Sequence, residues 1–208
     1  MNKLQKILQK YFGFGLYGLV RFKRGIRLST SITFRCNYYC NYCNMTIPSG
    51  KWPKSEEKTI CEWMNFLKTF PLKIKEVNVS GGEPTLIKGL QNYINWMLKE
   101  GYFVTLYTNL TNSAVISKIN PSFRFRVLTT YHHHAEKEQF EKTYKMLSKK
   151  YRVDIDEISK KYLKDSKLKS FDSKKTMKNS KYKRLRIAPD LQIFTDCYTM
   201  YSCRKYIK

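Results

Sequence analysis

Residues 76–101 read EVNVSGGEPTLIKGLQNYINWMLKEG and contain the patterns of a strand, a turn and a helix, in that order. Glu76–Ser80 predicts a β-strand, and the GGEP tetrapeptide at 81–84 predicts a tight turn. Apolar residues then recur at helical spacing until Gly101 ends the pattern. These apolar residues are Leu86, Leu90, Tyr93, Ile94 and Met97. The stretch therefore predicts one βα unit.

Further strand and helix patterns alternate on both sides of this unit. The other predicted strands are Arg27–Phe34, Tyr102–Tyr107, Phe125–Thr130 and Tyr151–Asp156. The other predicted helices are one capped by Ser55 and those at Ser113–Ile119, Glu136–Lys149 and Glu157–Leu168. In the helix capped by Ser55, Cys61 is expected to be a core thiol. This alternation predicts an α/β fold with a parallel sheet. Eight units usually need about 250 residues, so this chain of 208 predicts a partial (β/α)-type TIM barrel of about five to six units.

Three regions differ in composition and predict the domain organisation. Residues 28–170 hold the repeating pattern and form the predicted core domain. Residues 1–27 form a basic helical leader, which we expect either to pack on the core or to contact an anionic membrane surface. Residues 171–208 form a Lys-rich linker, a hairpin around Pro189-Asp190 and a Cys-containing tail.

The overall composition excludes some classes of protein and leaves others open. A hydrophobic fraction of 42% and an aromatic fraction of 15% exclude a disordered chain. No apolar run approaches the roughly 20 residues that span a bilayer. The net charge of +24 favours nucleic acid, acidic lipid or acidic peptide as a partner, unless it reflects only a Lys-rich solvated surface. The clustered cysteines, and the lack of a signal-peptide cleavage site, predict a cytoplasmic protein.

Residues 36–43 read CNYYCNYC and contain three cysteines that are candidate metal ligands. Three thiolates in so short a loop can converge on one metal centre, and thiolates select zinc, iron–sulfur clusters or copper(I). A structural zinc site needs four ligands, and no fourth Cys or His stands at finger-like spacing. An iron–sulfur cluster, a zinc ion with a distant fourth ligand, and no metal at all remain open from spacing alone.

The CxxxCxxC spacing after the first strand, together with GGEP after the second, resembles the radical S-adenosylmethionine (SAM) superfamily. The resemblance covers roughly residues 28–156. It implies that Cys36, Cys40 and Cys43 hold a [4Fe–4S] cluster whose fourth iron is chelated by SAM. It also implies a set of SAM-binding residues: Tyr42, Gly81, Gly82, Glu83, Pro84, Thr108 and Asn109.

The resemblance gives each of these residues an expected role. Tyr42 lies against the adenine. Gly81 and Gly82 leave backbone polar groups open to the methionyl ammonium, and Glu83 supports that edge. Thr108-Asn109, at the end of the third strand, stands on the ribose side.

The family's reaction follows from the same resemblance. An electron donor of the flavodoxin or ferredoxin type reduces the cluster, SAM is cleaved to a 5′-deoxyadenosyl radical, and the radical abstracts hydrogen from a substrate. His132, the first of three histidines after the fourth strand, is expected to face the substrate or handle a proton. The alternative for His132 is an ordinary polar loop ahead of a helix.

The sequence leaves the substrate open among a peptide or protein, a nucleic acid, and a small sugar or nucleotide. Cys197 and Cys203 resemble a remnant of an auxiliary-cluster domain, although a redox-active pair or unligated thiols fit them too. The alternative function is a non-catalytic protein that holds zinc or a structural cluster and binds nucleic acid through its basic ends.

Overall fold

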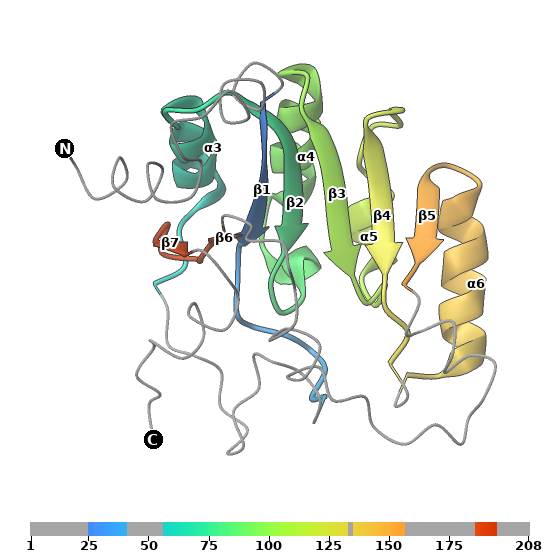
Figure 1. Ribbon diagram of the computed structural model, residues 1–208. Helices are drawn as coiled ribbons and strands as arrows, with labels where there is room; N and C mark the ends of the chain where they lie inside the picture. The colour runs from blue at the N-terminus through green and yellow to red at the C-terminus, as the bar shows by residue number, and fades with distance from the viewer. Residues whose placement is uncertain (1–24, 41–55, 133–134, 157–185, 195–208) are drawn as a thin grey trace, which may run out of the picture.

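The structure, a computed structural model, describes residues 25–40, 56–132, 135–156 and 186–194. These residues form a seven-stranded sheet of order β5-β4-β3-β2-β1-β6-β7 (Figure 1). The strands are β1 (Ile26–Ser31), β2 (Ile74–Ser80), β3 (Phe103–Thr108), β4 (Phe125–Thr129), β5 (Arg152–Ile155), β6 (Arg186–Ile187) and β7 (Ile193–Phe194). Strands β1 to β5 pair in parallel, β6 runs parallel to β1, and β7 is antiparallel to β6. The predicted parallel sheet is confirmed.

Helices follow the strands in the predicted alternation. They are α3 (Ile60–Lys68), the 3-10 turn η1 (Pro84–Leu86), α4 (Leu90–Lys99), α5 (Ser113–Ile116) and α6 (Lys137–Ser148). Leu86 belongs to η1 and not to α4, because Gly89 in the left-handed region (φ +84°) separates the two. The helix predicted at 157–168 lies outside the described residues. None of the helices that the structure describes is both long and apolar enough to cross a membrane.

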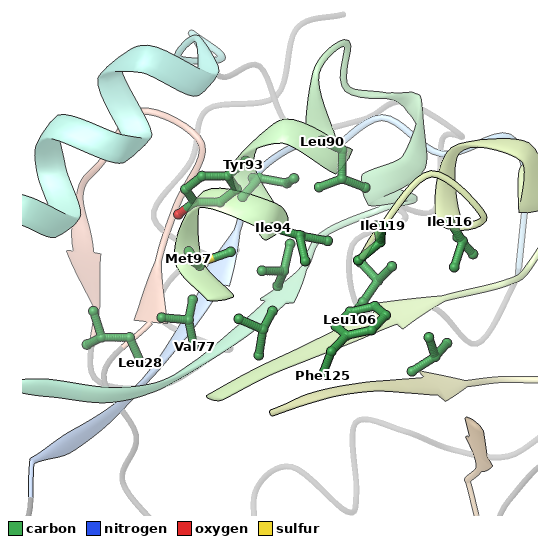
Figure 2. Close-up of a cluster of buried hydrophobic side chains, with 14 of the residues drawn as sticks. Leu28, Val77, Leu90, Tyr93, Ile94, Met97, Leu106, Ile116, Ile119 and Phe125 are labelled. Carbon is green, nitrogen blue, oxygen red and sulfur yellow. The ribbon is translucent and has the colours of Figure 1, made fainter. Parts of the chain in front are cut away.

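One hydrophobic core joins the sheet to the helices (Figure 2). Val77 and Val79 of β2 are fully buried and pack against α4, whose Tyr93 and Met97 are also fully buried. Trp63 of α3 belongs to the same core. Because successive strand residues point to opposite faces, Asn78, which stands between the two valines, faces away from this core. The helices therefore cover one face of the sheet.

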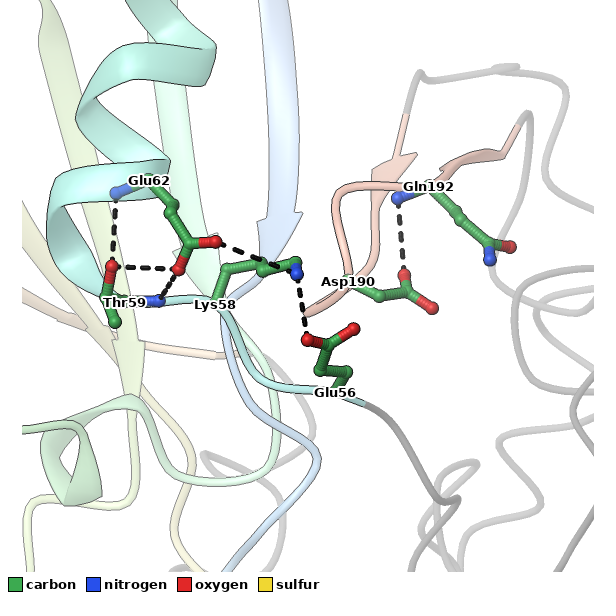
Figure 3. Close-up of polar contacts among 6 residues, drawn as sticks. All are labelled: Glu56, Lys58, Thr59, Glu62, Asp190 and Gln192. Atoms are coloured by element: carbon green, nitrogen blue, oxygen red, sulfur yellow. Dashed lines mark hydrogen bonds and ion pairs between the residues drawn. The ribbon is translucent and has the colours of Figure 1, made fainter.

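Helix α3 begins later than predicted. Its N-cap is Thr59, which forms a capping box with Glu62 (Figure 3). Ser55, the predicted cap, lies outside the described residues, and Ile60 is the first helical residue. The expectation for Cys61 is wrong: its side chain is exposed, because it lies on the opposite side of the helix from the buried Trp63.

The predicted C-terminal hairpin is confirmed, and it is an edge of the main sheet. Thr30 of β1 pairs with Ile187 of β6, and Ile187 is fully buried. The backbone N–H of Lys58, just before α3, donates to the carbonyl of Pro189 in the hairpin turn at 3.1 Å. Figure 3 shows Lys58 and the hairpin turn close together. The boundaries drawn at residues 27 and 170 stay predictions, since residues 1–24 and 157–185 lie outside the described residues.

Candidate functional site

The candidate site lies at the edge of the sheet where the parallel strands end. Strands β1 to β4 all point to this edge, and residues 32–40, here called the Cys segment, run from β1 along it (Figure 1). In parallel α/β sheets, loops at the carboxyl ends of the strands form the ligand site. The fold therefore places the Cys segment where a cofactor site is expected.

The sulfur atoms of the two described cysteines of the motif both lie against nitrogen atoms. The backbone N–H of Tyr38 donates to Sγ of Cys36 at 3.4 Å. Sγ of Cys40 lies 3.3 Å from Nδ1 of His132, and Cys40 is only 5% exposed. Hydrogen bonds to sulfur favour the thiolate, which is the form that binds iron. Cys43, the third predicted ligand, lies outside the described residues.

His132 therefore lies on the cysteine motif, although the sequence led us to expect it to face a substrate. Tyr38 packs edge-on against the His132 ring, with ring centroids 5.3 Å apart. Burial, and then the nearby Cys40 and Cys36, raise the pKa of Tyr38, which keeps its hydroxyl neutral. Sequence analysis missed Tyr38. The only signal for it was an aromatic residue inside the motif itself.

The two glycines of the GGEP turn are required by the Cys segment. A Cβ on Gly82 would lie 2.0 Å from the carbonyl oxygen of Arg35, and a Cβ on Gly81 would lie 2.3 Å from that of Thr33. The backbone N–H of Gly82 donates to Thr33 at 2.9 Å, and that of Glu83 donates to Arg35 at 2.8 Å. We expected the glycines to allow a close approach of the backbone to SAM. In the structure they also allow a close approach of the GGEP turn to the backbone of the Cys segment.

Glu57 fixes the Cys segment from a second side. Its carboxylate accepts from Nε of Arg35 at 3.0 Å and forms an ion pair with Nη2 at 2.8 Å. It also contacts the hydroxyl of Thr33. The segment is therefore held between the GGEP turn and the residues that precede α3.

Glu83 is fully buried and ties the GGEP turn to the end of β3. Its carboxylate accepts from the backbone N–H of Thr85 at 3.0 Å and from that of Asn109 at 2.8 Å. The hydroxyls of Thr85 and Thr108 donate to it at 2.6 and 2.8 Å. Burial raises the pKa of Glu83 above its ordinary value, and these hydrogen bonds lower it only in part. Three predicted SAM-site residues, Glu83, Thr108 and Asn109, thus form one polar unit.

A second network joins the end of β3 to the cysteine motif. Nδ2 of Asn109 donates to Oδ1 of Asn37 at 2.9 Å, and Nδ2 of Asn37 donates to the hydroxyl of Thr111 at 2.7 Å. That hydroxyl in turn donates to Oδ1 of Asn109 at 2.7 Å. Sequence analysis missed Asn37 and Thr111, although Thr111 lies in the conspicuously polar run after β3. The closed triangle holds the residue next to Cys36 against the strand edge.

The structure thus brings all nine of the described candidates together at one edge. These are Cys36, Cys40, Gly81, Gly82, Glu83, Pro84, Thr108, Asn109 and His132. Tyr42 lies outside the described residues. The two thiols, one accepting from the N–H of Tyr38 and the other beside Nδ1 of His132, suit an iron–sulfur ligand set. The described part of the site therefore fits the cluster that the resemblance implies.

Comparison with known proteins gives the family. The sequence model of the Radical SAM superfamily matches residues 30–184. The chain belongs to the radical SAM superfamily. This superfamily uses a [4Fe–4S] cluster and SAM, as the resemblance implied.

The radical SAM chain is similar to several proteins with different named activities. It is 28% identical over 123 residues to the GTP 3′,8-cyclase of Campylobacter fetus, covering 53% of this chain and 38% of that protein. It is 36% identical over 86 residues to the PqqA peptide cyclase of Bradyrhizobium diazoefficiens, covering 41% and 21%. The chain thus spans less than half the length of these curated relatives.

Solved structures confirm the fold. The crystal structure of BtrN in complex with AdoMet and 2-DOIA superposes with a TM-score of 0.55 at 14% identity, covering 88% of this chain and 77% of that chain. Streptococcus suis SuiB bound to precursor peptide SuiA gives a TM-score of 0.50 at 10% identity, covering 88% and 62%. The predicted partial barrel is therefore confirmed as the radical SAM fold.

Proposed function

We propose that this chain is a catalytic radical SAM enzyme that abstracts hydrogen from a peptide substrate. The observation that carries the catalytic part is the direct connection between the two family motifs. The GGEP turn donates two backbone hydrogen bonds to the Cys segment, through Gly82 and Glu83. Gly81 and Gly82 make this contact possible, because a Cβ on either would meet a backbone oxygen of the Cys segment.

Each residue has a role in this proposal. When a [4Fe–4S] cluster and SAM are bound and an electron donor of the flavodoxin or ferredoxin type is present, they would supply the chemistry that abstracts a hydrogen atom from the substrate. Cys36, Cys40 and Cys43 hold the iron. Glu83 holds the end of β3 against the GGEP turn, so that Thr108 and Asn109 stay at the cofactor edge. His132 supports Cys40 through its Nδ1 atom.

Two observations support a peptide as the substrate. The relative with 36% identity is a peptide cyclase, and SuiB was solved with a precursor peptide. The net charge of +24 also favours an acidic substrate, because long-range attraction raises the rate of encounter. The GTP 3′,8-cyclases and the nucleotide dehydratase among the relatives make a nucleotide the second candidate. For either substrate we place the reaction in the cytoplasm, where reduced electron donors are present.

Reconstitution without oxygen tests the catalytic proposal. We expect a brown protein with about four irons that forms 5′-deoxyadenosine from SAM and dithionite. Cys36→Ala should lose most of the iron and the product. Cys61→Ala is the matched control, since this thiol is exposed on α3 and should leave both unchanged. One equivalent of zinc in place of iron, or a loaded cluster that forms no 5′-deoxyadenosine, would favour the non-catalytic alternative.

A further inference from the structure

Strand pairing brings six polar residues into one row across the sheet. In register from β6 to β5, this polar row consists of Arg186, Ser29, Asn78, Thr105, Arg126 and Arg152. Asn78 lies between Val77 and Val79, which point into the core below the helices. The polar row therefore lies on the opposite face of the sheet.

The centre of the row is buried as well as polar. Ser29, Asn78 and Thr105 are only 4%, 3% and 2% exposed. Strands of a parallel sheet that are buried on both faces are usually apolar throughout. The buried polar row in the middle of this sheet is an exception to that rule. A role in binding a ligand would explain the exception.

Asn78 carries an unsatisfied polar atom. Its Oδ1 is buried and has no hydrogen-bond partner in the part of the chain that the structure describes. Its Nδ2 makes one long contact, 3.4 Å to the hydroxyl of Ser29. Exchanging the two ends of the amide leaves its NH2 group without an acceptor instead, so one end lacks a partner in either orientation. Buried amides of this kind are uncommon without a partner, and a ligand is one way to supply it.

Arg126 reaches toward the same place. Its Nε donates to the hydroxyl of Thr105 at 2.9 Å, which draws the guanidinium over β3, the strand next to Asn78. Two other arginines of the sheet have acidic partners: Arg27 of β1 pairs with Glu76, and Arg152, next to Arg126 in the polar row, pairs with Asp154. Among the described residues, Arg126 has no such pair, so its terminal NH2 groups can receive a carboxylate.

We propose that Asn78 and Arg126 form a subsite for an acidic peptide segment, with Asn78 pairing with a backbone amide and Arg126 with a side-chain carboxylate. A peptide group offers both an N–H and a carbonyl to the Asn78 amide, whereas a phosphate at neutral pH offers mainly acceptors. Asn78 precedes Gly81 by three residues, about 10 Å along an extended strand. That separation places the anchored segment within reach of the cofactor edge. This inference rests on the proposed function and names its substrate more closely.

Binding of a defined probe tests the subsite on the reconstituted chain. The probe is a fluorescein-labelled peptide of alternating glutamate and glycine, measured by fluorescence anisotropy in the presence of SAM. We expect Asn78→Leu and Arg126→Gln each to raise the dissociation constant at least tenfold. Lys118→Gln, on an exposed lysine beyond α5, removes the same charge and should change it less than twofold. Each variant is first shown to hold about four irons.

Thermal unfolding gives a second readout that does not depend on binding. Leucine is nearly isosteric with asparagine and removes an unpaired buried amide, so Asn78→Leu should unfold at the same or a higher temperature. A lower unfolding temperature would assign the amide to the structure and overturn the proposal. Equal peptide binding by the wild type and all variants would also overturn the proposal. So would a wild type that does not bind the peptide but binds GTP, if Arg126→Gln abolishes the GTP binding. Failure of the wild type to form 5′-deoxyadenosine would count against the proposed function alone, because anisotropy needs no turnover.

Discussion

Glu83 shows how one side chain can organise a cofactor edge before any cofactor binds. Its carboxylate accepts four hydrogen bonds, from Thr85, Thr108 and Asn109, while fully buried. Removing such an acceptor leaves several buried donors without partners, which is far more costly than losing one surface contact. The residue that the family resemblance assigned to SAM therefore also holds two strand ends together.

The raised pKa of Glu83 gives a pH dependence with a definite sign. A buried carboxyl whose pKa lies above the usual 4.5 holds its proton more tightly in the folded chain. Its contribution to the free energy of unfolding is therefore present at low pH and is lost as the pH rises from about 4.5 through the raised pKa. We expect this fall in the wild type. It should be absent in Glu83→Gln, which should also be less stable by about 1–3 kcal/mol, because its NH2 group meets the N–H of Asn109.

Chemical denaturation across this pH range checks the prediction, with Glu62→Gln as the control. Hydrogen bonds from Thr59 lower the pKa of Glu62, so the contribution of Glu62 is lost as the pH falls, in the opposite direction. A fall of equal size in the wild type and in Glu83→Gln would show that another group is responsible.

His132 provides a test at the cysteine motif. An N–H donated to a cysteine sulfur stabilises the reduced cluster and raises its potential. His132→Phe keeps a ring to pack against Tyr38 but removes Nδ1, which lies 3.3 Å from Sγ of Cys40 and donates to it when it carries the proton. The midpoint potential, followed by electron paramagnetic resonance, should become more negative by tens of millivolts at unchanged iron content. His132→Asn, which restores an N–H, should recover part of the shift, and an unchanged potential would assign His132 to structure alone.

The sequence predicted the site's positions better than its internal contacts. Cys36, Cys40, Glu83 and Thr108 lie at the expected edge, because motifs that follow parallel strands converge there. The partnership of His132 with Cys40 could not be predicted, since it joins residues 92 apart and depends on how two loops fold.

At the scale of elements, the junction between the GGEP turn and the Cys segment is the least tolerant part of the fold. Gly82→Ala places a methyl group 2.0 Å from a backbone oxygen, which cannot move aside as a flexible side chain could. We expect the Cys segment to be displaced and iron content after reconstitution to fall below half of the wild-type value. Iron analysis measures this directly.

Gly101→Ala is the control for this substitution. Its added methyl group meets nothing within 4 Å, but its φ of +87° strains any other residue by about 1–2 kcal/mol. It should therefore lower stability and leave iron content unchanged. Equal iron loss in both variants would mean that general destabilisation, and not the contact with Arg35, explains the effect.

The helix boundaries show where sequence reasoning failed and why. The two glutamates that follow Ser55 favour it as a cap. Thr59, however, is followed at the third position by Glu62, the glutamate that a capping box requires. The spacing of Thr59 and Glu62 identifies the start of α3 and places Cys61 on the exposed side of this helix. The apolar spacing of α4 was unambiguous, and that helix was predicted to within a few residues.

At the scale of the whole molecule, the strand order carries information that no local pattern holds. The hairpin was predicted, but its pairing with β1 was not, because residues 29 and 186 are distant in sequence. Within β2 and β3 the polar row corresponds to an alternation of polar and apolar residues in the sequence. A polar residue between two buried valines departs from the apolar pattern usual in a parallel strand that is buried on both faces.

Ile187 tests whether the hairpin contributes to the stability of the sheet. It is fully buried beside β1, so Ile187→Ala should lower the free energy of unfolding by about 2–5 kcal/mol. Ile193→Ala, in the half-buried outer strand β7, should cost clearly less. Denaturation curves for the two variants settle the comparison, and equal small losses would show that the hairpin is a dispensable appendage.

The pairing of β6 with β1 also sets an order of events on the ribosome. About 155 residues must be translated between the two strands, which takes on the order of ten seconds. During that time the nascent chain presents the cysteine motif beside a strand edge that has no neighbour, and such an edge invites association with other chains. Iron delivery therefore belongs after β6 and β7 have closed that edge, and a chaperone that holds the nascent chain is of most use before then.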